Sequence, residues 1–177
     1  MKARKTEKLT RSLFSTFARC NREGNLDHLF IFEKSIVEGK KGEDLFFELY
    51  SRNPFLGEIR RSDGIKEDFF LGDKSLELKS EYYDALKTPN FFIEKFSNFE
   101  AMTFGGPWRA EIHDVFYYAH FFTLSCELYL FKTKELMQQI RGYDDRWLLP
   151  IRNKTWTTYG FKVLRTKLRD VYDYHQL

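Results

Sequence analysis

The stretch KEDFFLGDKSLELKSEYY, residues 66–83, constrains the fold of this chain more than any other segment. Two short runs rich in Phe and Leu flank Gly72-Asp73-Lys74, which predicts a β-hairpin with a tight turn. Yet the runs also hold Asp68, Glu77 and Lys79. Because side chains alternate along a strand, a hairpin with one buried face has to collect these charged residues on the other face.

The expected register follows from the same alternation. Pairing across a turn centred on Asp73-Lys74 sets Leu71 opposite Leu76, and Asp68 opposite Lys79. The apolar face then consists of Phe69, Leu71, Leu76 and Leu78, and the polar face of Asp68, Phe70, Ser75, Glu77 and Lys79. A slip by one residue would scatter the apolar residues over both faces, so burial favours this register.

The polar face predicts a site for phosphodiester hydrolysis. Two carboxylates a few ångströms apart repel each other unless a cation lies between them, and hard oxygen ligands favour Mg²⁺ or Mn²⁺. Such an ion acidifies a bound water and neutralises phosphate charge, while a neighbouring lysine orients that water. The alternative is a solvated sheet face on which Lys79 simply pairs with Asp68 and Glu77.

These residues resemble the motif of the PD-(D/E)XK nuclease superfamily. The core of that superfamily runs helix, three strands, helix, strand, with Asp on the second strand and (Asp/Glu)-x-Lys on the third. The matching residues are Asp68 in KEDFFL and Glu77-Leu78-Lys79 in LELK. Glu67 stands where the superfamily often has Pro before the Asp.

The superfamily also tends to place an acid on the first helix, and the segment GKKGEDLFFELY offers two. On a helix, Glu43 lies about 70° from the centre of the apolar face and Glu48 about 150° away. We therefore expect Glu43 to join the site and Glu48 to face solvent.

The likeness continues past the hairpin and resembles small phage-type members, over roughly residues 38–165. A strand of the T-G-N-hydrophobic-hydrophobic-E kind follows the E-x-K in those proteins, and then come a Gly-rich turn, a short helix and an aromatic strand. The matching residues are Thr88, Asn90, Glu94, Gly105-Gly106 and Asp114, and Pro89 stands where Gly is usual.

The resemblance implies a Mg²⁺-dependent deoxyribonuclease with a restriction-endonuclease-like core. In such a site, Asp68 and Glu77 would bind the metal together with the carbonyl of Leu78. Glu43 would assist directly or through a water, and Lys79 would position the attacking water. Mn²⁺ would be an acceptable substitute for Mg²⁺.

DNA is the expected partner, with RNA left open. The weaker candidates for contact with it are Lys40, Lys41, Asn90 and Arg109, with Glu94 at the rim of the site. The formal charge of +3 permits such binding without requiring it. A homodimer is expected by analogy only, in the cytoplasm of a bacterium or of a phage-infected host cell. A non-catalytic nucleic-acid-binding or assembly protein that keeps the fold is the alternative function.

The whole pattern predicts one α/β or α+β domain with a mixed β-sheet flanked by helices. Helices are expected over 6–20, 38–53, 105–114 and 133–142, and strands over 55–62, 64–71, 74–79, 88–96, 115–122 and 126–132, with a last strand and a helical end over 157–174. The segment 26–36 is ambiguous, and residues 1–35 are expected to form a basic helical extension. No apolar run reaches the ~18 residues of a membrane span, so we expect no membrane partner.

Other polar residues suggest weaker alternatives. His113-Asp114 resembles the metal pair of helical HD phosphohydrolases, but the surrounding segments predict strands, and we expect Asp114 to make local hydrogen bonds. His120 lies in an aromatic strand, where a core histidine is expected. Cys20 and Cys126 match no metal-binding spacing.

Overall fold

The computed structural model describes residues 27–82, 87–153 and 155–177. The chain divides into two compact units, residues 1–35 and 36–177. Of the first unit only residues 27–35 are described, as the start of a helix. The helix expected over 6–20 lies outside the described residues. No helix in the described part of the chain is long and apolar enough to cross a membrane.

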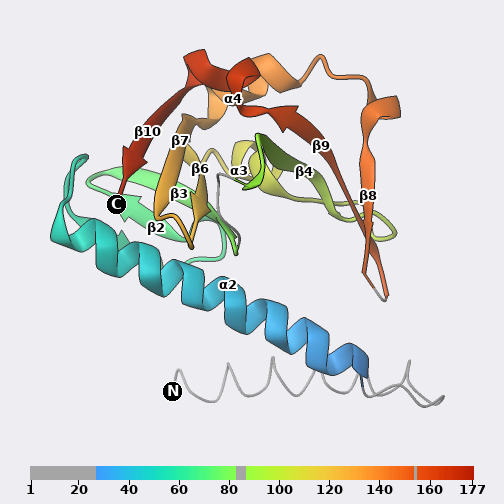
Figure 1. Cartoon of the computed structure of the whole chain (residues 1–177), viewed down its shortest axis with the longest axis horizontal. Helices are drawn as coiled ribbons and strands as arrows, with labels where there is room; N and C mark the ends of the chain where they lie inside the picture. The colour runs from blue at the N-terminus through green and yellow to red at the C-terminus, as the bar shows by residue number, and fades with distance from the viewer. Residues whose placement is uncertain (1–26, 83–86, 154) are drawn as a thin grey trace. The chain divides into compact units, whose positions relative to one another are not determined.

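The central element of the second unit is a six-stranded mixed sheet. Its strands lie in the order β1 (Ile59–Arg61), β2 (Phe69–Leu71), β3 (Lys74–Glu81), β6 (Tyr117–Phe122), β7 (Glu127–Lys132) and β10 (Tyr172–Gln176). Neighbouring strands are antiparallel except β3 and β6, which run parallel. The prediction of an α+β fold with a mixed sheet flanked by helices is confirmed, and the order of the elements can be followed in Figure 1.

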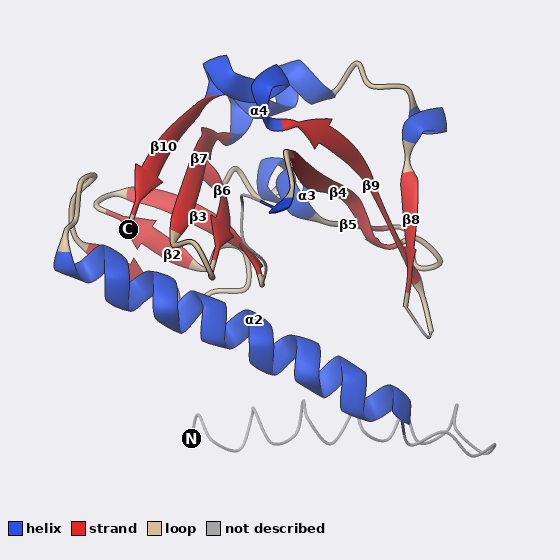
Figure 2. Ribbon diagram, viewed as in Figure 1, coloured by secondary structure: helices blue, strands red, loops and turns tan. Residues whose placement is uncertain are grey.

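A second sheet of four antiparallel strands lies beside the central one, where the sequence predicts a single sheet. Its order is β5 (Thr103–Phe104), β4 (Asn90–Asn98), β9 (Thr157–Leu164) and β8 (Leu149–Arg152). Figure 2 shows the two sheets as separate groups of strands. The strands expected over 88–96 and after residue 157 are present, but they pair with each other instead of extending the central sheet.

Helix α2 (Asp27–Arg52) is longer than predicted, because the ambiguous segment 26–36 continues into the helix expected over 38–53. Gly42 lets this helix approach strand β3 closely. A Cβ on Gly42 would lie 2.5 Å from the Cβ of Ser80. The helical turn that carries Glu43 is therefore held against the central sheet.

The shorter helices are α3 (Gly106–Ile112) and α4 (Thr133–Ile140), and the 3₁₀ turns are η2 (Asp145–Trp147) and η3 (Arg165–Val171). Both α-helices were predicted. The helical end expected before residue 174 is present as the 3₁₀ helix η3, but it ends at Val171, where the chain continues as strand β10. Pairing with β7 satisfies the backbone groups of that strand, and Tyr172 and Tyr174 pack against Tyr129.

The central sheet is buried on both faces. The cluster that includes helix α2 contains Phe46, Tyr50, Phe69, Leu71, Leu76, Ala119, Phe121, Leu128 and Leu130. The cluster that includes the second sheet contains Phe91, Ile93, Tyr118, Phe122, Tyr129, Phe131, Phe161 and Val163, with helices α3 and α4. Because side chains alternate, Glu77 and Lys79 lie on the face toward the second sheet, next to Tyr118 and His120 of β6.

Candidate active site

The β2–β3 hairpin differs by two residues from the predicted register. Phe69 lies opposite Leu76 and Leu71 opposite Lys74, so Gly72 and Asp73 alone form the loop. The prediction of Leu71 opposite Leu76 was wrong because Gly72 adopts a φ of +60°, which glycine reaches without strain and which closes a two-residue turn. A displacement by two residues leaves every side chain on its predicted face.

The apolar face of the hairpin is buried as predicted. Phe69, Leu71 and Leu76 are at most 1% exposed, and Leu78 packs partly buried against the same cluster. The backbone N–H of Asp68 donates to the carbonyl of Leu76 over 2.9 Å, so the residue is bonded to β3 although it lies immediately before β2. This burial holds the charged residues of β3 on the other face.

Asp68 is fixed to β3 by its own side chain. Its Oδ2 atom accepts a hydrogen bond from the backbone N–H of Leu78 over 2.8 Å. The carboxyl group therefore lies beside the segment Glu77-Leu78-Lys79. Burial raises the pKa of Asp68, while the hydrogen bond from Leu78 and the charge of Arg109 oppose the rise.

Glu43 approaches the same place from helix α2. It is partly buried, and burial, followed by the charge of Asp68, raises the pKa of its carboxyl group. Glu48, one turn later, is exposed and forms an ion pair with Arg52. The helix therefore places Glu43 near the acids of the hairpin and turns Glu48 to solvent.

Glu77 is the most strongly perturbed acid of this group. Its side chain is 12% exposed, and burial together with the charge of Asp68 raises its pKa to about 7. Its Oε1 atom accepts a hydrogen bond from Arg109. The other oxygen, Oε2, is buried without a hydrogen-bond partner within the described ranges. One carboxylate oxygen is thus available to a ligand that is not a side chain of this site.

Arg109, expected as a contact for nucleic acid, lies within the acidic group. Besides its bond to Glu77 it donates from Nη2 to the carbonyl of Ile65 over 2.5 Å. It links helix α3, strand β3 and the loop before Asp68. No local sequence pattern predicts this ion pair, because Glu77 and Arg109 are 32 residues apart in the chain.

Lys79 faces an acid from the second sheet. Its Nζ atom lies 4.0 Å from Oε2 of Glu94 on β4, and the side chain of Glu94 is 17% exposed. Next to Lys79 on β6, His120 is fully buried, and burial, followed by the charge of Lys79, lowers its pKa to about 3. His120 is therefore a neutral core histidine, as predicted.

The remaining candidates lie at different distances from this group. Lys40 and Lys41 are exposed on α2, and the charge of Lys40 acts on Glu43. Asn90 starts β4 four residues before Glu94, about 13 Å away along the strand. The structure thus brings Lys40 near the acids but does not bring Asn90 there.

The acids form no ready-made metal centre. Within residues 27–82, 87–153 and 155–177, no group of three His, Cys, Asp or Glu side chains is arranged to hold a metal ion. Asp114 instead pairs with Lys134 over 3.3 Å on the surface, so His113-Asp114 is not part of such a group either. What the site offers is a set of partly buried oxygen donors, a lysine and one arginine that partly neutralises them.

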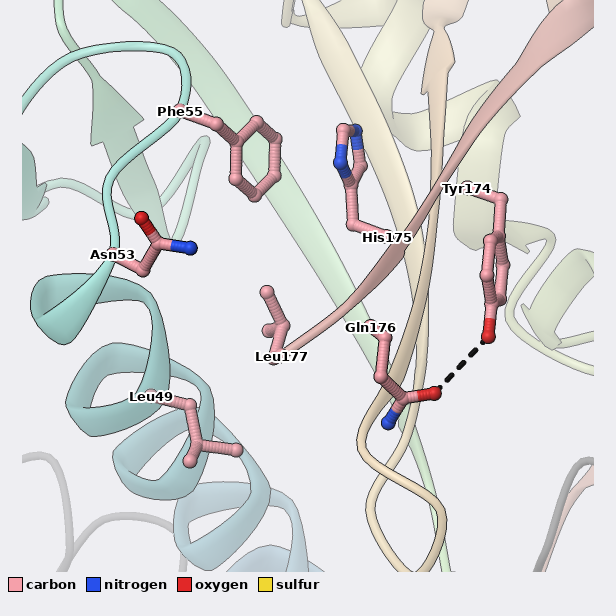
Figure 3. A pocket seen from close by; sticks show the side chains of 7 residues that line it. All are labelled: Leu49, Asn53, Phe55, Tyr174, His175, Gln176 and Leu177. Carbon is pink, nitrogen blue, oxygen red and sulfur yellow. Dashed lines mark hydrogen bonds between the residues drawn. The ribbon is translucent and has the colours of Figure 1, made fainter.

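A cavity of about 300 Å³ exists elsewhere in the unit. Its lining consists of Leu49, Asn53, Phe55, Tyr174, His175, Gln176 and Leu177 (Figure 3). The rings of Phe55 and His175 stack at 3.7 Å, and the hydroxyl of Tyr174 donates to Gln176. None of the acids described above lines this cavity, so the acidic group on β3 remains the candidate active site.

Comparison with known proteins identifies no relative of this chain. No family model, no curated protein and no solved structure matches the chain.

Proposed function

We propose that this protein is a divalent-metal-dependent nuclease that hydrolyses phosphodiester bonds in DNA. The observation that carries the proposal is the buried Oε2 atom of Glu77, which has no hydrogen-bond partner among the described residues, on the strand segment to which the carboxylate of Asp68 is bonded. The charges of Asp68 and Glu43 both raise the pKa of Glu77, and such mutually destabilised acids are concentrated at functional sites. The alternative, in which these residues form an ordinary solvent-exposed face of the sheet, is disfavoured because the side chain of Glu77 is only 12% exposed.

The order of the elements supports a restriction-endonuclease-like core. Helix α2, strands β1, β2 and β3, helix α3 and strand β6 follow one another, with β4 and β5 inserted before α3. Asp68 immediately precedes the second strand, and Glu77-Leu78-Lys79 lie on the third. This is the order of the PD-(D/E)XK superfamily that the sequence resembles.

The donor set fits Mg²⁺ or Mn²⁺ in its chemistry, because it consists of oxygens and includes the unpartnered Oε2 atom of Glu77. Asp68 and Glu77 would hold the ion with the carbonyl of Leu78, and Glu43 would join directly or through a water. A bound ion would acidify a water molecule and neutralise charge on the phosphate.

The protein's own side chains divide the remaining work. Lys79 donates hydrogen bonds to the attacking water and keeps it in line with the phosphorus atom. Glu77, with its pKa raised to about 7, has to lose its proton before it acts as a ligand. Lys40 and Lys41, one turn before Glu43, are placed to contact the phosphate backbone. We propose further that the protein acts in the cytoplasm as a homodimer.

A non-catalytic nucleic-acid-binding protein is the second candidate. The contact between Arg109 and Glu77 favours it, because a guanidinium group neutralises a carboxylate without any metal. The two candidates differ in whether DNA is cut.

The test is a cleavage screen with supercoiled, linear, branched and single-stranded DNA and with RNA, in Mg²⁺, Mn²⁺ or chelator. The proposal predicts metal-dependent cleavage by the wild type, loss in Asp68→Asn, and full retention in Glu48→Gln, whose carboxylate is exposed. Binding of DNA without cleavage under every condition would favour the second candidate. Cleavage of RNA alone would correct the substrate.

A further inference from the structure

We propose that Glu94, on the second sheet, is a positioning residue that orients Lys79 in the site. The inference rests on the nuclease function proposed above and adds a residue from outside the helix–strand core to its machinery. Glu94 lies on β4, and its carboxylate faces the ammonium group of Lys79 at 4.0 Å.

The position of Glu94 is imposed by the turn that starts helix α3. A Cβ on Gly105 would lie 2.0 Å from Oε1 and 2.8 Å from Cδ of Glu94. A Cβ on Gly106 would lie 2.6 Å from the backbone oxygen of Glu94. The two glycines therefore form a cradle, a space without side-chain atoms that the side chain of Glu94 fills. A larger residue at position 105 or 106 would place atoms in that space.

The surroundings restrict the carboxylate to the neighbourhood of Lys79. The hydroxyl of Tyr118 borders the same cradle, 3.3 Å from the place of a Cβ on Gly106. Tyr118 stands next to Glu77 in the β3–β6 register, and Lys79 follows two residues later on the same face. Glu94 thus lies over the polar face of β3, on the side away from helix α2.

This arrangement explains how a long, flexible side chain is held for catalysis. Lys79 is 38% exposed, and an unrestrained lysine in that setting samples many rotamers. A carboxylate fixed by backbone on one side narrows that range, and misplacement of a catalytic group by about 1 Å can cost a hundredfold in rate. We infer that the second sheet orients the lysine while the first holds the acids.

The pairing is testable without substrate or metal. The ion pair with Glu94 restrains the Nζ atom of Lys79 and should slow the reaction of this amine with an acylating reagent. Glu94→Gln breaks the pair at nearly constant shape and should therefore raise the labelling rate of Lys79 about threefold or more, measured by peptide mass spectrometry at fixed pH.

Asp145→Asn is the matched control. Asp145 pairs at 2.6 Å with Lys95, which follows Glu94 on strand β4. It should raise the labelling of Lys95 and leave that of Lys79 unchanged.

A second variant acts on the cradle alone. Gly105 has an extended backbone with φ of −126°, which alanine adopts freely, and the three atoms nearest to an added Cβ all belong to the side chain of Glu94, so Gly105→Ala displaces that side chain first. It should reproduce the labelling pattern of Glu94→Gln. Gly142→Ala, where a Cβ meets nothing within 4 Å, should not. Unchanged labelling of Lys79 in both Glu94→Gln and Gly105→Ala would overturn the pairing.

Single-turnover cleavage of DNA tests whether the pairing of Glu94 with Lys79 contributes to catalysis. Glu94→Gln should lower the rate constant about tenfold or more while DNA affinity, measured by fluorescence anisotropy without metal, stays the same. Faster labelling with an unchanged cleavage rate would make the pair structural and refute the positioning role. Absence of cleavage by the wild type would refute the proposed nuclease, and the labelling experiment would still decide the pairing.

Discussion

Replacement of Glu77 by glutamine should make the metal-free protein more stable above pH 7. Burial and the charge of Asp68 move the pKa of Glu77 from 4.5 to about 7. At about 1.4 kcal/mol for each pKa unit, the charged form destabilises the fold by roughly 3 kcal/mol. Glutamine has nearly the same shape and never ionises, so it removes this cost.

The sign of the pH dependence follows from proton binding. Between pH 4.5 and about 7 the folded protein keeps a proton on Glu77 that the unfolded chain has released. Stability of the wild type therefore falls as pH rises through this window and stays lower above it. The advantage of Glu77→Gln should grow over the same window and level off near pH 8.

The assay is urea denaturation in chelator from pH 4.5 to 8.5, followed by tryptophan fluorescence. Glu48→Gln is the control, and its free energy of unfolding should stay within about 0.5 kcal/mol of the wild type at every pH, because Glu48 is exposed. Parallel curves for wild type and Glu77→Gln, or lower stability of the variant at pH 8, would refute the burial argument.

Three further variants test separate parts of the site and fold. Lys79→Ala should lose cleavage yet bind Mg²⁺ in calorimetry, with the salt slope of DNA binding reduced by at most about one phosphate contact; loss of metal binding would refute this division of roles. Arg109→Gln should bind Mg²⁺ more tightly at pH 8, because the guanidinium on Glu77 opposes a cation, whereas Arg52→Gln, which breaks an ion pair with exposed Glu48, should not; weaker binding would mean that Arg109 orients Glu77 instead. Phe69→Ala should destabilise the fold by about 3–5 kcal/mol in urea denaturation because Phe69 is fully buried, and a loss below about 1 kcal/mol would contradict its place in the core.

The faces of the hairpin were predictable from the sequence, and its register was not. Alternation alone separates Phe69 and Leu76 from Asp68 and Glu77, because burial of one face leaves no other choice. The pairing also depends on which two residues turn, and the φ of +60° at Gly72 decided that. A two-residue error kept the site residues together.

The second sheet and the charged pairs could not be read from the sequence. Strand β4 pairs with β9 across more than sixty intervening residues, as in Phe91 opposite Val163, and no local pattern specifies such a partner. The same holds for Arg109 with Glu77 and for Lys79 with Glu94, which tertiary packing brings together. The helical end was extended three residues too far, into β10, because only pairing with the open edge of β7 selects the strand conformation there.

The most direct test of the account is the single-turnover rate of DNA cleavage in Mg²⁺ by Glu77→Gln beside the wild type. We expect a wild type that cuts DNA only with a divalent ion, and a variant that is folded but slower by at least about a hundredfold. Equal cleavage rates for the two proteins would contradict the assignment of the acidic group on β3 as the active site.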